Sequence, residues 1–153
     1  AIDTSSSSWA GCRTARFIAT ATNHTSGTWT GADGMIAVVL RNAKASGPIG
    51  GHALSAQTAP ANTCPGATIT LSEDDGTSII LKFYGYGDAF NSVTSISSAP
   101  SGHTRQVTGT YSANKVALCL NTKDSSTSDS ATAQPSSTSC WSWGASVEVL
   151  QTT

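Results

Sequence analysis

Apolar and polar residues alternate along much of this chain, and the alternation predicts β-strands. In residues 13–22 every second side chain from Ala15 to Ala21 is apolar, as in a strand that buries one face. Residues 140–150 alternate over a longer stretch and place Trp141 and Trp143 on one face with Ala and Val side chains. Residues 35–41 are apolar nearly throughout, which is typical of a central strand covered on both faces.

Two hairpins are predicted between these segments. The first spans residues 67–84 and turns at residues 73–76, where an Asp-Gly step supplies the backbone conformation that a tight turn needs. The second spans residues 105–120 and turns around residues 112–114. About seven or eight strands separated by Gly, Pro and Asn predict an all-β chain, folded as an antiparallel β-sandwich or, alternatively, as a closed β-barrel.

Composition agrees with a chain built from strands. The 153 residues include 24 Ser and 22 Thr, whose side chains compete with helical hydrogen bonding, while Thr favours strands. A chain of this length most simply forms one domain, residues 1–153, with a single core.

Charge is sparse, and this excludes several partners. Eight Lys and Arg residues and nine Asp and Glu residues leave a formal net charge of -1 without a basic cluster, so no binding to nucleic acid or to an anionic membrane is expected. The longest apolar run, residues 35–40, is far shorter than the roughly 20 residues of a spanning helix, so no membrane span is predicted.

Four cysteines, Cys12, Cys64, Cys119 and Cys140, occur without a CxxC motif or a histidine at zinc-site spacing. An even number in a hydroxyl-rich chain favours two disulfides in a protein that is secreted or displayed at the cell surface. Cys119 and Cys140 bracket a Ser/Thr-rich stretch, residues 121–139, which we expect to be a long polar loop. The predicted pairs are therefore Cys119–Cys140 and, by default, Cys12–Cys64, although four cysteines allow three pairings.

Aromatic side chains are the candidate ligand-binding residues. Residues two positions apart on a strand point to the same face of the sheet. The pair Tyr84 and Tyr86 and the pair Trp141 and Trp143 could therefore each form a platform for a sugar ring. The alternative for the tryptophans is a place in the core. The full candidate set is Trp29, Tyr84, Tyr86, Asp88, Trp141 and Trp143, with Trp9 as a further aromatic ring in a polar segment.

Signals for chemistry are weak. His24, His52 and His103 are scattered, so we predict no metal site and no cofactor. No GxSxG motif is present, and only two glutamates are available for a carboxylate pair, so no catalytic residue is predicted. Asn23 begins the single N-x-[ST] sequon and would be glycosylated only if the source were eukaryotic.

These observations favour a secreted or cell-surface recognition module without enzymatic activity. Its expected partner is a glycan or cell-surface polysaccharide, as in lectins and adhesins. The alternative is a structural subunit of an extracellular filament, pilus or coat that associates with copies of itself. A small secreted hydrolase is the third possibility.

Overall fold

β-Strands account for all the regular structure in the described part of the chain. The computed structural model describes residues 1–6, 11–25, 27–73, 76–87, 93, 95–111, 116–124, 129 and 132–152. The strands are β1 (Asp3–Ser6), β2 (Gly11–Thr14), β3 (Ile49–Ala56), β4 (Ala61–Cys64), β5 (Ile79–Gly87), β6 (Thr104–Tyr111), β7 (Val116–Asp124) and β8 (Gln134–Val149). The described residues contain no helix, so no helical segment among them could cross a membrane.

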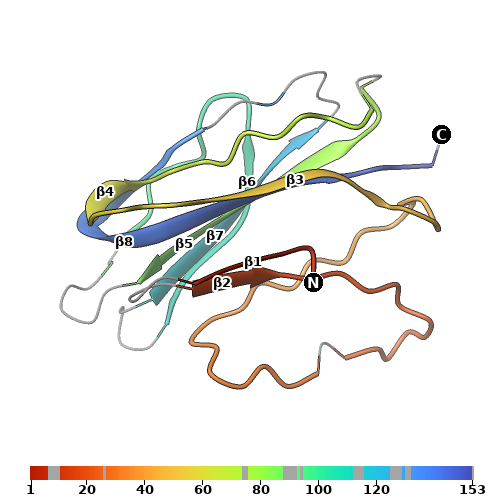
Figure 1. Cartoon of the computed structure of the whole chain (residues 1–153), viewed down its shortest axis with the longest axis horizontal. Helices are drawn as coiled ribbons and strands as arrows, with labels where there is room; N and C mark the ends of the chain where they lie inside the picture. The colour runs from red at the N-terminus through yellow and green to blue at the C-terminus, as the bar shows by residue number, and fades with distance from the viewer. Residues whose placement is uncertain are drawn as a thin grey trace.

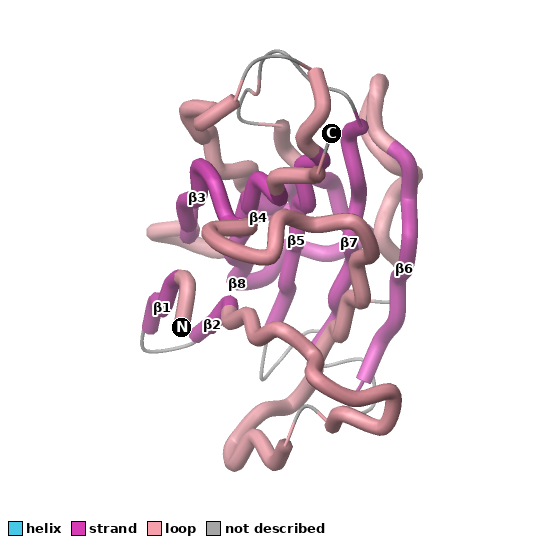
Figure 2. Tube along the Cα trace, turned by 90° about the vertical axis from the view of Figure 1, so that its right-hand side faces the viewer, coloured by secondary structure: helices cyan, strands magenta, loops and turns pink. Residues whose placement is uncertain are grey.

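The main sheet has the strand order β3-β8-β5-β7-β6, and all of its pairings are antiparallel (Figure 1). β8 is long enough to serve three partners: its first half pairs with β4, and its second half lies between β5 and β3. The sheet curls into a half-barrel (Figure 1). β1 and β2 form a separate hairpin, and β3 and β6 lie at opposite edges of the main sheet (Figure 2). The prediction of an all-β antiparallel fold is confirmed.

β5 lies at the centre of the sheet, and its alternating side chains separate two layers. One face, here called the aliphatic face, is built around Leu81, Leu120 and Val147. The opposite face, here called the tyrosine face, carries Tyr84 and Tyr86 with Ala117, Val93 and the cysteines Cys64, Cys119 and Cys140. Both faces of β5 are thus buried, as in a strand at the centre of a layered structure.

Two predicted strands differ from the structure. Residues 35–41 are not a strand but cross over the aliphatic face, where Ile36 and Leu40 pack against the sheet and Val39 stays 86% exposed. In residues 13–22 only the first two positions belong to a strand, and Phe17 is 56% exposed. In both segments the side-chain pattern is that of a strand, but neither segment pairs with the main sheet, whose edges are formed by β3 and β6.

The predicted hairpins and long loop have mixed outcomes. The second hairpin is confirmed as β6 and β7, and the turn predicted around residues 112–114 lies outside the described residues. In the first hairpin only the returning strand forms, as β5, which pairs with β7 and β8. The loop predicted over residues 121–139 is shorter, because β7 continues to Asp124 and β8 begins at Gln134.

Glu148 ties three segments together inside the fold. Its side chain is completely buried, and its carboxylate accepts hydrogen bonds from the backbone N–H groups of Gly51 (2.7 Å), Ser72 (2.7 Å) and Glu73 (3.3 Å). A Cβ atom at Gly50 would collide with this carboxylate, so the glycine permits the approach of β3. Burial raises the pKa of Glu148, but the three N–H donors outweigh burial and hold it below its ordinary value of 4.5.

We expect the substitution Glu148→Gln to lower the free energy of unfolding by about 2 to 4 kcal/mol at neutral pH, because an amide cannot accept all three backbone hydrogen bonds. Since the folded pKa of Glu148 is lowered, its stabilisation is present above pH 4.5 and is lost as the pH falls through the folded pKa. Urea unfolding followed from neutral pH into acid should therefore show a shallower decline for the variant than for the wild type.

Glu73→Gln is the matched control for this experiment. The Glu73 carboxylate contacts Lys44 at a partly exposed site, so its loss should change the free energy of unfolding by less than about 1 kcal/mol. Equal effects of the two substitutions would contradict the role given to Glu148.

Candidate functional site

The two tyrosines predicted to bind a ligand are core residues. Tyr84 and Tyr86 are each 1% exposed, and their hydroxyl groups donate hydrogen bonds to the backbone oxygens of Thr132 and Gln134, both at 2.7 Å. Burial raises the pKa of both phenols well above its ordinary range. Their rings therefore have no free face for a sugar, and their hydroxyls instead hold Thr132 and the first residue of β8 against the sheet.

The predicted tryptophan pair lies on the other side of the sheet. Trp141 and Trp143 are half-buried, and their partners on β5 are Gly87 and Gly85. A Cβ atom at Gly85 would overlap the indole of Trp143, so this ring is packed directly over the β5 backbone. The tyrosine and tryptophan pairs thus face opposite layers and do not form one platform.

The remaining candidates do not gather around either pair. Trp29 is half-buried, and the guanidinium group of Arg13 lies 5.4 Å from the centre of its ring, within the range of a cation–π contact. Asn23 is exposed in the long loop after β2. Trp9 and Asp88 lie outside the described residues.

The prediction of two disulfides is not supported, since no disulfide joins any of the four cysteines. Cys119 on β7 is opposite Tyr84, whereas Cys140 precedes the position on β8 that is opposite Gly87. β5 runs between β7 and β8, so these two strands are about 10 Å apart, beyond the roughly 7 Å Cα separation that a disulfide spans. Cys12 and Cys64, the other predicted pair, lie in different sheets, on β2 and β4.

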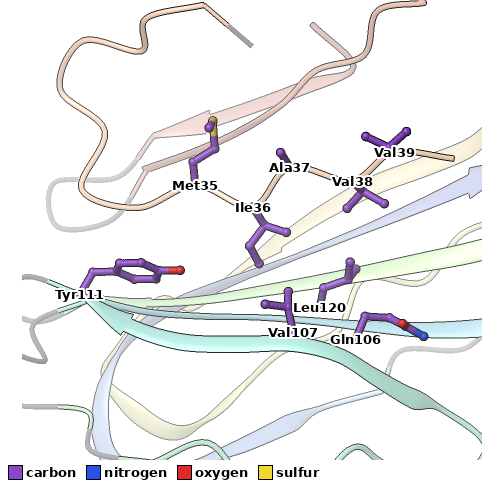
Figure 3. A pocket seen from close by; sticks show the side chains of 9 residues that line it. All are labelled: Met35, Ile36, Ala37, Val38, Val39, Gln106, Val107, Tyr111 and Leu120. Carbon is purple, nitrogen blue, oxygen red and sulfur yellow. The ribbon is translucent and has the colours of Figure 1, made fainter. Parts of the chain in front are cut away.

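A groove that the sequence did not predict lies on the aliphatic face (Figure 3). Residues 35–39 pass over β6 and β7 without joining the sheet, and Ile36 and Val38 point down toward Val107 and Leu120. The space between them is about 340 Å³ and continues into a second hollow of about 260 Å³ towards Ile79 and Leu81.

Exposed apolar side chains surround this groove. Met35, Val38, Val39, Val107 and Tyr111 are each between 38% and 86% exposed. Among the residues that the structure describes, no charged side chain lines the first part of the groove, and Asp124 lines the second. The arrangement suits the burial of apolar surface, since contiguous exposed apolar patches mark interaction sites.

β6 adds a second property to this surface. It is the last strand of the sheet order, and in the described part of the chain it pairs with β7 alone. Its other edge therefore presents backbone N–H and C=O groups that a further strand can pair with. The one indication of this surface in the sequence is the apolar run over residues 35–40. From its apolar character alone, we predicted a buried strand and not the border of a groove.

No family model, curated protein or solved structure matches this chain.

We expect the cysteine thiols of the folded protein to resist alkylation near pH 8, because the reactive form is the thiolate. Burial raises the pKa of Cys12 to about 12, with a contribution from Asp3, and that of Cys119 to about 11. Burial also raises the pKa of Cys64 well above its ordinary value. Mass spectrometry after iodoacetamide treatment should find an unmodified folded chain and, in denaturant without reductant, four alkylated cysteines. Fewer than four would indicate a disulfide and contradict the structure.

Proposed function

We propose that this chain is a structural subunit of an extracellular or cell-surface assembly, and that it associates with further copies of itself. The observation that carries the proposal is the apolar groove over β6 and β7, directly beside the available edge of β6. Either feature alone is common in proteins. Together they offer a partner both apolar area and a row of directed backbone hydrogen bonds.

A second copy of the chain fits this surface better than a charged partner. The groove residues carry almost no charge, and the net charge of the whole chain is only -1, so copies repel each other little at short range. Two copies related by a twofold axis would bring their β6 edges together in antiparallel pairing, with Val107 and Tyr111 of each next to the groove of the other. A twofold contact of this kind needs only one self-complementary surface.

The extracellular location rests on composition. Ser and Thr make up close to a third of the residues and charged side chains only 11%. The four thiols are buried, which protects them from oxidation in the absence of disulfides.

Carbohydrate binding has less support than self-association. Tyr84 and Tyr86 are buried, and Trp141 and Trp143 are packed on the opposite face. Among the described residues, the large apolar side chains that are most exposed belong instead to the groove and to the loop after β2.

We expect Val107→Lys to weaken self-association by about tenfold to a hundredfold. Placing a charge in the groove removes the burial of one Val side chain, about 1.5 to 3 kcal/mol, from the interface. Size-exclusion chromatography with light scattering over a range of concentrations would measure the change. Thr58→Lys, which adds the same charge at an exposed position of the loop between β3 and β4, should leave association unchanged.

Two results would contradict this proposal. One is a wild-type chain that stays monomeric at the highest concentration tested. The other is selective binding to a glycan array that is lost on Trp141→Ala or Trp143→Ala but not on Val107→Lys, which would favour the carbohydrate-binding function.

A further inference from the structure

Lys82 and Asp129 form an ion pair in the interior of the protein. Lys82 lies at the centre of β5 on the tyrosine face, and its Nζ atom is 2.7 Å from Oδ1 of Asp129. Both side chains are only 1% exposed. Lys44 and Glu73 also form a lysine–carboxylate pair, but their side chains are 36% and 29% exposed. The pair of Lys82 and Asp129 differs from it because both groups are shielded from water.

The surroundings of Lys82 orient its amine. Nζ donates hydrogen bonds to the backbone oxygen of Ala67 (3.3 Å) and to Oγ of Ser146 (3.2 Å), and this Oγ in turn donates to the Ala67 oxygen at 2.6 Å. These contacts fix the position of Nζ, and they leave it within hydrogen-bond distance of the Asp129 carboxyl group.

The carboxyl group of Asp129 lacks the partners that a buried carboxylate needs. Neither oxygen accepts a hydrogen bond of normal geometry from a described residue, although Nζ lies close to Oδ1. A buried charge without such partners is strongly disfavoured. An uncharged group in place of the ion pair would suit this environment better.

Thr132 and the first residue of β8, Gln134, are fixed against the sheet. The hydroxyl groups of Tyr84 and Tyr86 bind the backbone oxygens of Thr132 and Gln134. Arg105 and Asn121 both donate to Oε1 of Gln134 at 3.0 Å. These contacts, together with those of the Lys82 amine, bring the residues before β8 close to the centre of β5.

We propose that Lys82 and Asp129 condense to form an intramolecular amide bond. In this step Nζ of Lys82 attacks Cγ of Asp129, the Nζ–Cγ bond forms, and one Cγ–Oδ bond breaks. Of the three protons that the amine and the carboxyl group carry together, the amide N–H keeps one and the departing oxygen takes two as water, so no oxidant, reductant or cofactor is needed. Holding the two groups in contact replaces a bimolecular encounter, and the exclusion of water disfavours the reverse hydrolysis. This inference does not depend on the proposed function.

The intact mass of the purified protein tests the proposal directly. After denaturation and complete reduction of cysteines, the wild type should be lighter than its sequence by one water. Lys82→Met and Asp129→Ala should each have the full sequence mass. Lys44→Met, which disrupts the exposed pair, should keep the loss of water and serves as the matched control.

Peptide mapping distinguishes the amide bond from other dehydrations. Proteolysis of the wild type should yield one branched peptide that contains both Lys82 and Asp129, whereas ring closure of an aspartate onto its own backbone joins no two peptides. A wild-type protein of full sequence mass after prolonged incubation in the folded state would overturn the proposal, whether or not the variants fold. A loss of water without the branched peptide would overturn it equally.

Discussion

A lysine at the centre of a strand that is buried on both faces sets the main constraint on this structure. The amine of Lys82 has no access to water, and an uncompensated charge at such a site would cost several kcal/mol. Besides Ser146 on β8, two of its partners come from segments outside β5 and its neighbouring strands: the Ala67 carbonyl precedes β5, and Asp129 precedes β8. Both segments must lie on the tyrosine face for the amine to be satisfied. The layer that covers this face is therefore organised around one polar group.

The two faces of the sheet are closed in different ways. On the tyrosine face, directed contacts from Lys82, Tyr84, Tyr86 and Glu148 hold the covering segments in defined positions. On the aliphatic face, residues 35–40 cover the sheet through apolar contacts alone and leave a groove beside β6. Apolar packing without a ladder of hydrogen bonds does not specify how closely a segment approaches. A well-fixed interior and an incompletely covered surface are together compatible with a building block for larger assemblies.

The alternation of apolar and polar residues correctly predicted strands that pair with a strand close by in the sequence. It did not predict pairings between strands that are far apart in the sequence. The hairpin of β6 and β7 and the second part of β8, residues 140–149, were predicted from the alternation of apolar and polar residues. Alternation does not reveal which segment pairs with which, so residues 35–41 were predicted to be a central strand, although β5 occupies that place. Likewise, Lys82 within an aliphatic and aromatic run gave no sign of its partner, because Asp129 lies 47 positions later. The cysteine pairs were inferred from their order along the chain, but β5 separates two of them.

The long β8 strand also has a consequence for how the protein reaches this structure. β3, β4 and β5 all pair with β8, although the three precede it by many tens of residues. Until residues 134–149 have left the ribosome, these strands lack their shared partner, while β5, β6 and β7 can already pair among themselves. Folding during synthesis should thus pause at a three-stranded intermediate with exposed apolar surface, and sheets that close through such distant pairings form slowly. Until β8 arrives, the edge of β5 that later pairs with it stays open.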